Sequence, residues 1–332
     1  MADMTVQADA TLRSPKRRRG ARLGKVPWYV YLLLIIAVIS CAFPLYYMFV
    51  VASVGASAVT SVPPRLYPGT NIVAVATKVF DTVPFVRSLL NSAFVSLTVA
   101  VLSVVLCALA GFAFAKLHFK GRNALFILVL LTMTVPAQLS VIPQYLIISE
   151  LGWVDSLQAI IVPGLASAFG IFWMRQHMSS TVTDELMHAA RLDGCNSWQL
   201  FWRIAFPVVR PAAFVLGLIT FTAVWNDFMW PFIVLKSPEL FTVQIALKQL
   251  QANRSIDVAL ALGGSFFATL PLLIAFAFAG RQMVSGIMEG AFKGLMASSP
   301  RRRHTDHALA PRGALWSLAP EEPAAGEVVK AA

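Results

Sequence analysis

The chain has 332 residues, of which 58% are hydrophobic and only 13% are charged, and its mean hydropathy is +0.70. This composition lies far from that of soluble domains and predicts an all-α integral membrane protein. The net charge of +11 does not indicate nucleic-acid binding, because the basic residues are concentrated between apolar stretches that are long enough to cross a bilayer.

Six apolar runs are each long enough to cross a hydrocarbon core of roughly 30 Å, which takes about 20 residues of helix. In chain order, we expect these transmembrane helices at residues 28–52, 89–115, 124–148, 156–174, 211–235 and 260–280. Pro136 and Pro143 in the third run and Pro163 in the fourth are compatible with spans, because neighbouring helices satisfy the freed backbone groups. The first run is too long for the apolar core of a cleaved signal peptide, so we expect it to remain as a span.

Lysine and arginine residues indicate which span ends face the cytoplasm, because basic residues near span ends are retained on that side. Most of the 27 Lys and Arg residues lie in the N-terminal arm, in the loops after the second and fourth spans, and in the C-terminal tail. We therefore expect both termini to be cytoplasmic. Residues 1–27, with a basic run at 16–19, and residues 295–332 lack an apolar face and are expected to be disordered, and residues 28–294 form the transmembrane domain.

Residues 183–207, between the fourth and fifth spans, are too polar to cross a membrane and too patterned for a simple linker. Thr183 or Asp184 can cap a helix that Gly194 ends, and a second short helix is expected from Ser197. Pro207 and Pro211 are expected to end this second helix before the fifth span. Its apolar residues recur at three- and four-residue spacing and predict one buried face, formed by Trp198, Phe201, Trp202 and Ala205. The pattern alone fits equally an amphipathic loop on the membrane surface.

Several positions in this loop have a recognisable spacing, in which His188-Ala189-Ala190 is followed by Gly194, Ile204 and Pro207. The pattern resembles the EAA loop of binding-protein-dependent ABC import permeases, where Glu occupies the position of His188. Motifs at 91–92, 110–116, 135–136, 142–143, 225–231 and 280–294 resemble the carbohydrate-uptake branch of that family, and the last of them resembles the end of the maltose-system subunit MalG. The resemblance covers residues 28–294.

This resemblance implies a type I ABC importer permease fold in a bacterial plasma (inner) membrane, surrounded by lipid. It also implies that the loop inserts into a cleft of an ATPase subunit as a coupling helix, with coupling residues Glu185, His188, Ala189, Ala190, Asp193, Gly194, Ile204 and Pro207. The implied partners are a second homologous permease, a dimer of ATPase subunits and an extracytoplasmic sugar-binding protein, which would dock on residues 53–87 and 236–257.

We expect no catalytic or cofactor-binding residues in this chain. The sequence has no Gly-x-x-x-x-Gly-Lys-Ser/Thr loop, since the nearest stretch, residues 20–25, has the wrong spacing. ATP and Mg are therefore expected on the partner ATPase. The five histidines and three cysteines have no ligand-like spacing, so no metal site is expected.

Polar residues inside the apolar runs are candidates for the translocation pathway, because an ionisable group at membrane depth is costly unless it faces protein, water or substrate. Asn226 and Asp227 lie in the fifth run, and we add Asn91 and Trp230. Hydrogen bonding between helices, or an interfacial position for the tryptophan, explains the same residues equally well.

The sequence leaves other functions open. The same machinery could import a polyol, a glycerophosphodiester or an amino acid instead of a sugar. An ion-coupled secondary transporter or a membrane-embedded enzyme would need several intramembrane charges or a cluster of catalytic groups, and the runs contain little beyond Asp227.

Overall fold

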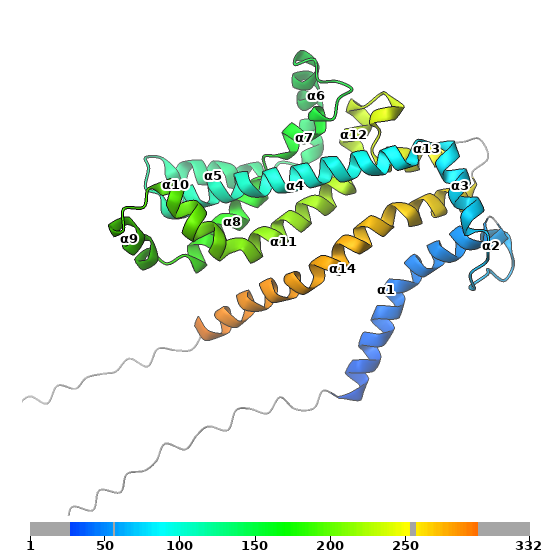
Figure 1. Cartoon of the computed structure of the whole chain (residues 1–332), viewed down its shortest axis with the longest axis horizontal. Coiled ribbons are helices and arrows are strands. Elements are labelled where there is room, and N and C mark those ends of the chain that lie inside the picture. The colour runs from blue at the N-terminus through cyan, green and yellow to red at the C-terminus, as the bar shows by residue number, and fades with distance from the viewer. Residues whose placement is uncertain (1–26, 56, 253–256, 298–332) are drawn as a thin grey trace, which may run out of the picture. The chain divides into compact units, whose positions relative to one another are not determined.

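The computed structural model describes residues 27–55, 57–252 and 257–297, which are mostly helical and include no strand (Figure 1). The expected arm and tail lie outside these residues, except that the last helix continues to Ala297, past the predicted start of the tail. The chain divides into two compact units, Met1–Met288 and Glu289–Ala332. The elements discussed below lie in the first unit, except for the last residues of the final helix, which belong to the second.

The helices follow one another with short connections. The first part of the chain forms α1 (Trp28–Val54), α2 (Ser57–Thr60), α3 (Ile72–Thr82), α4 (Phe85–Lys116), α5 (Arg122–Thr132), the short 3-10 helix η1 (Ala137–Ser140) and α6 (Val141–Glu150). The rest forms α7 (Gln158–Gly164), α8 (Ala168–Thr181), α9 (Asp184–Leu192), α10 (Ser197–Gln199), the π-helical turn η2 (Leu200–Ala205), α11 (Phe206–Trp225), α12 (Met229–Val234), η3 (Pro238–Leu240), α13 (Val243–Ala252) and α14 (Val258–Ala297).

The prediction of about six spans agrees with the structure. Five helical stretches of the described chain are long and apolar enough to cross a membrane, and they comprise α1, α4, α7 with α8, residues Ser197–Trp225, and the first part of α14 (Val258–Phe278). The sixth is a bent pair, because α5 and the η1–α6 segment meet at an angle of 96° around the Pro136 break. The third predicted span is therefore interrupted rather than straight.

The predicted bounds of the fifth span were wrong at both ends. Pro207 and Pro211 do not separate the loop from the span, since the chain is helical without interruption from Ser197 to Trp225. The π-helical turn η2 directly before Pro207 accommodates a residue that cannot donate an α-helical hydrogen bond. The helix then ends at Trp225, where the backbone amide and the side-chain Nδ2 of Asn226 both donate to the Thr222 carbonyl, at 3.1 and 2.9 Å.

Helix α4 is the centre of the bundle and packs along α8 and α11 (Figure 1). Its crossing with α8 is close because small residues lie at the contact. A Cβ atom added at Gly111 would lie 2.7 Å from the Arg175 backbone nitrogen, and one at Gly170 would lie 2.6 Å from Cys107 Sγ. Small residues allow membrane helices to approach to this distance, so the crossing fixes α4 against α8.

Hydrogen bonds join the segment that follows α12 to one end of α4 and to Asp155, which lies between α6 and α7. We call this set of residues (Asn91, Ser92, Asp155 and residues 234–243) the α12–α13 clasp. Asn91 Nδ2 donates to the carbonyls of Glu239 and Phe241 at 2.9 and 3.1 Å, and Ser92 Oγ accepts from the Val243 amide at 2.8 Å. Asp155 accepts from the amides of Lys236 and Ser237 at 2.8 and 2.9 Å and from the Ser237 hydroxyl. These hydrogen bonds lower the pKa of the Asp155 carboxyl.

Helix α1 contributes little to this packing. Its last residues, 50–54, are buried against α2 and α3, whereas Leu33, Ile36 and Ile39 each expose more than half of their surface. An apolar helix with such a face meets lipid or another membrane-spanning chain.

Candidate functional site

The loop between the fourth and fifth spans has the local structure that its sequence predicts. Thr183 caps α9 by accepting a hydrogen bond from the Leu186 amide at 3.4 Å. After α9, Gly194 adopts a φ of +83°, a left-handed conformation that favours glycine. Asn196 and Gln199 then form a reciprocal capping box that starts the next helical stretch at Ser197. The loop is therefore a rigid bracket built from its own caps.

The expected coupling residues are mostly on the accessible face of this bracket. Glu185, His188, Ala189, Asp193 and Gly194 are exposed, Ala190 is buried, and Ile204 and Pro207 are half-buried. Beside them lie large apolar side chains that are also exposed: Leu186 at 42%, Leu192 at 89% and Trp198 at 60%. Apolar side chains gathered on a polar loop are typical of a protein-docking surface.

The predicted single buried face of the second helix was wrong. Phe201 and Ala205 are fully buried, but Trp198 and Trp202 expose 60% and 37% of their surface. The aromatic rings of Trp198, Phe201 and Trp202 contact one another, so the spacing predicted that these side chains are neighbours but not that the two tryptophans stay exposed. Leu200, which the α-helical pattern missed, takes an inward place and is 1% exposed.

Packing and one ion pair attach the bracket to the bundle. Met187, Ala190, Leu200 and Phe201 share an apolar cluster with Phe112 of α4 and Met178 of α8. Lys116, at the end of α4, donates from Nζ to Asp184 Oδ1 at 2.7 Å. The Lys116 side chain is only 8% exposed, whereas that of Asp184 is 77% exposed. This hydrogen bond and the Lys116 charge lower the pKa of the Asp184 carboxyl.

A second site is a polar pocket of about 320 Å³, formed where the third span bends and where the chain is non-helical between α11 and α12. Its polar lining consists of Gln138, Ser140, Gln144 and Asp227, and Trp230 forms part of its wall. Trp230 is 9% exposed and its indole nitrogen donates to the Ala159 carbonyl at 3.0 Å, which fixes the ring. Pockets of this size and mixed lining suit a small polar solute.

The four predicted pathway residues are therefore divided. Asp227 and Trp230 line the polar pocket, whereas Asn91 belongs to the α12–α13 clasp and Asn226 is exposed and does not line the pocket. Asn226 instead bonds within its own helix and accepts from Gln244 at 3.5 Å. For these two asparagines the observed contacts are packing contacts; a role of any of the four in the pathway stays a prediction.

Comparison with known proteins identifies the chain. Residues 103–283 match the family of binding-protein-dependent transport system inner membrane components, and this match covers more than half of the chain. The chain belongs to this family. The match includes the bracket and the helices that hold it, so the chain is a transport permease that spans the membrane.

Several characterised relatives of this permease carry substrate names. It is 35% identical over 204 residues to the arabinooligosaccharides transport system permease protein AraQ of Bacillus subtilis, covering 61% of this chain and 72% of that protein. It is 34% identical over 198 residues to the lactose transport system permease protein LacG of Rhizobium radiobacter, covering 60% and 72%. It is 30% identical over 236 residues to the sn-glycerol-3-phosphate transport system permease protein UgpE of Escherichia coli, covering 68% and 84%.

Solved structures support the fold assignment. The permease superposes on a chain from the crystal structure of a bacterial ABC transporter involved in the import of the acidic polysaccharide alginate, with a TM-score of 0.67 and 23% identity over 76% of this chain and 95% of the other. The same transporter type in complex with an alginate pentasaccharide-bound periplasmic protein gives a TM-score of 0.53 at 17% identity, covering 77% and 95%. The expected type I ABC importer permease fold is confirmed.

Sequence reasoning missed the polar residues that the third span brings to the pocket. Gln138, Ser140 and Gln144 lie on η1 and α6, beyond the bend. Three polar residues close to Pro136 and Pro143 inside an apolar run were the available signal, because a broken helix at membrane depth is stable only where it lines protein or a cavity. Within the described residues, no three His, Cys, Asp or Glu side chains are placed to hold a metal ion.

Proposed function

We propose that this permease is one of two membrane-spanning subunits of an ATP-driven sugar importer, and that its 183–207 bracket couples it to a separate ATPase. The observation that carries the proposal is the bracket itself, which is rigid, exposes Leu192 and Trp198, and is attached to the central helix α4 through Lys116. A rigid element that packs on the bundle can transmit the displacement of a bound partner.

The proposal places ATP and Mg on the partner ATPase and no cofactor on this chain. It requires the bracket and both termini on the cytoplasmic side, in accord with the distribution of basic residues. A second homologous permease would complete the pathway, and an extracytoplasmic binding protein would dock on the loops at 53–87 and 236–257. The exposed apolar face of α1 is available to lipid or to the second permease.

A sugar is the solute class that the polar pocket favours. Gln138, Ser140 and Gln144 offer uncharged donors and acceptors, which suit hydroxyl groups. The names of AraQ and LacG point to the same class.

A phosphorylated solute is the second candidate, because UgpE is a relative over 84% of its length. The pocket residues that this chain contributes argue against it. Asp227 is their only ionisable side chain, and no Lys or Arg lines the pocket. A carboxylate without a nearby cation repels a phosphate, so a neutral solute is the better match.

The coupling proposal is tested by recovering the tagged full-length permease from native membranes in mild detergent and identifying its partners by mass spectrometry. Leu192→Asp changes the most exposed apolar side chain of the bracket without touching the core, so we expect it to lose the ATPase and keep the second permease. Val62→Asp, at a 96% exposed position outside the bracket, is the matched control and should keep both partners. Retention of the ATPase by Leu192→Asp, or its absence from the wild type, would contradict the proposal.

The substrate proposal is tested separately by uptake into cells that carry or lack this permease. Radiolabelled arabinooligosaccharide, lactose and sn-glycerol-3-phosphate are supplied one at a time. We expect loss of the permease to abolish uptake of at least one sugar and to leave sn-glycerol-3-phosphate uptake unchanged. The opposite pattern would establish the phosphorylated solute.

A further inference from the structure

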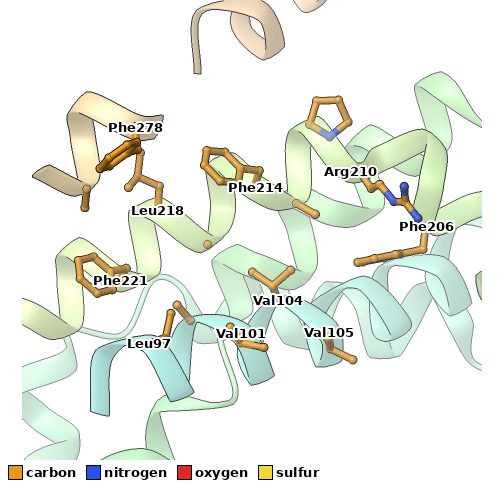
Figure 2. A pocket seen from close by; sticks show the side chains of 15 residues that line it. Leu97, Val101, Val104, Val105, Phe206, Arg210, Phe214, Leu218, Phe221 and Phe278 are labelled. Carbon is orange, nitrogen blue, oxygen red and sulfur yellow. The ribbon is translucent and has the colours of Figure 1, made fainter. Parts of the chain in front are cut away.

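A second hollow of the bundle is unlike the polar pocket. It is a groove of about 900 Å³ between α4, α11 and α14, lined by side chains from all three helices (Figure 2). Arg210 is the only polar or charged residue that lines it, and the walls are otherwise formed by residues such as Val101, Val104, Phe214 and Phe221. A wall of this kind does not suit a sugar, so the groove needs a different occupant.

The length of the groove matches one leaflet of a bilayer. Figure 2 shows Phe206 and Arg210 near one end and Phe221 near the other, all on α11. Phe221 lies fifteen residues after Phe206 and eleven after Arg210, which corresponds to about 22 Å and about 16 Å at the rise of an α-helix. One leaflet contributes about 15 Å of hydrocarbon to the bilayer core, and about 20 Å with its polar headgroup region. The groove therefore extends from the membrane surface beside the bracket to about the middle of the membrane.

The walls of the groove are apolar side chains from three helices, and thin, flexible hydrocarbon chains suit such a surface.

The charge at the surface end selects the headgroup. Arg210 is exposed, and no described carboxylate pairs with it, since the two ion pairs of the described residues join Arg87 to Glu239 and Lys116 to Asp184. An arginine beside an apolar groove at the membrane surface keeps its charged group at the headgroup level, where basic residues between membrane helices bind anionic lipids.

We propose that the groove is a binding site for an anionic phospholipid of the leaflet that faces the bracket. An acyl chain lies along the apolar wall between α4 and α11, and the phosphate accepts hydrogen bonds from the Arg210 guanidinium. The site does not depend on which solute the permease transports. Because α11 continues directly from the bracket, a lipid held at Arg210 contacts the helix at the point where the bracket enters the bundle.

The test uses the full-length permease, with any subunits that accompany it, in nanodiscs of equal phosphatidylglycerol and phosphatidylcholine, released into a native mass spectrometer. We expect the wild type to retain phosphatidylglycerol preferentially. Arg210→Gln should lower this retention about fivefold, as for the loss of one basic residue at a lipid surface. Arg210→Lys should keep most of it, and Lys120→Gln, which removes an exposed charge away from the groove, should leave it unchanged.

A second variant tests the apolar wall. Val101 is 54% exposed and lines the groove, so Val101→Trp fills the space without entering the core. It should lower retention of both lipids, whereas Arg210→Gln lowers that of phosphatidylglycerol alone. Equal retention of the two lipids by the wild type, or unchanged phosphatidylglycerol retention in both Arg210→Gln and Val101→Trp, would overturn the proposal.

Discussion

At one end of α4, Asn91 and Ser92 hold the segment after α12 through three hydrogen bonds to its backbone, and Asp155 adds others. At the other end, α4 is joined to α9 by one ion pair, Lys116–Asp184, and by apolar packing. Hydrogen bonds to backbone atoms fix both distance and direction, whereas apolar contact is not directional. We infer that the clasp end keeps one geometry while the bracket end can move as a body and displace the helices joined to it.

This difference fits an importer in which a partner moves one end of the permease. The bracket is internally rigid, because Thr183, Asn196 and Gln199 satisfy its helix ends locally. A displacement of the bracket is then transmitted to α4 and α11 rather than absorbed within the loop.

We expect the largest loss of stability from a substitution where α4 crosses α8, because this crossing lies between the clasp end and the bracket end of α4 and positions both. Gly111→Ala places a methyl group 2.7 Å from the Arg175 backbone nitrogen, which cannot move independently of α8. We expect the variant to be destabilised by about 1–3 kcal/mol through overpacking. Gly217→Ala is the matched control, because its nearest neighbour would be Val104 Cγ2 at 3.4 Å. Thermal melting in detergent distinguishes them, and equal melting temperatures would contradict the close crossing.

Removal of the Asp155 carboxylate should loosen the clasp end alone. In Asp155→Ala, the Lys236 and Ser237 amides lose their acceptor, and we expect their hydrogen exchange to become about tenfold faster. Exchange in residues 184–205 should not change. Asp193→Ala, at an exposed position of the bracket, is the control and should leave the clasp amides protected. Faster exchange at both ends would mean that they are not independent.

The hydrogen bonds that the Asp155 carboxylate accepts should also weaken in acid. Because the pKa of Asp155 is lowered in the folded chain, its contribution is complete above the ordinary carboxyl pKa of about 3.9 and is lost as the pH falls through the lowered folded value. The hydrogen-exchange rates of the Lys236 and Ser237 amides, corrected for the intrinsic effect of pH, should therefore stay low at neutral pH and rise only below about pH 4. Acceleration near pH 6 would point to another group.

An intermediate effect is expected at the polar pocket. Asp227→Asn removes the only charge among its lining residues, and we expect the KM for the transported sugar to rise about tenfold, as for the loss of one charge-assisted hydrogen bond. Asn226→Ala changes the neighbouring residue, which does not line the pocket, and should leave the KM unchanged. Equal effects of the two substitutions would place the solute elsewhere.

A smaller effect is expected for the ion pair at the bracket. Lys116→Met keeps most of the length and the buried apolar part of the side chain but removes the cation that pairs with Asp184. The Asp184 carboxylate is exposed and remains hydrated without this partner. We expect normal stability with a two- to fivefold lower amount of sugar transported per ATP, about what a pair with one exposed partner can contribute. The double variant Lys116→Asp with Asp184→Lys should restore part of the coupling. A fall in ATPase binding instead would assign the pair a docking role.

The sequence was sufficient for features that depend on local chemistry. The spans followed from apolar length, and the Thr183 cap and the Gly194 turn followed from residue type. The sequence was insufficient where a residue that usually ends a helix is accommodated by an irregular helical turn. Pro207 indicated a helix end, yet a π-helical turn carries the helix past it. The spacing also predicted a buried face that included Trp198 and Trp202, yet both side chains are exposed.

Contacts between distant segments could not be derived from the pattern. Asp227 was a candidate because a charge is rare at membrane depth, but Gln138 and Gln144 join it only through the bend after α5. Asn91 and Asn226 look like Asp227 as polar residues in apolar runs, and only the fold shows that their amides bond to backbone instead. The partner of Lys116 likewise lies far along the chain, at Asp184.

The most direct test of the account is a crosslink from the bracket to an ATPase in native membranes. A photoreactive amino acid placed at Leu192, which is 89% exposed, should attach to a soluble nucleotide-binding subunit, and the same group at Val62 should not. ATP binding should change the crosslinking yield if the bracket moves with the ATPase. Crosslinks from Leu192 to lipid alone would show that the bracket lies on the membrane surface and does not couple transport to ATP.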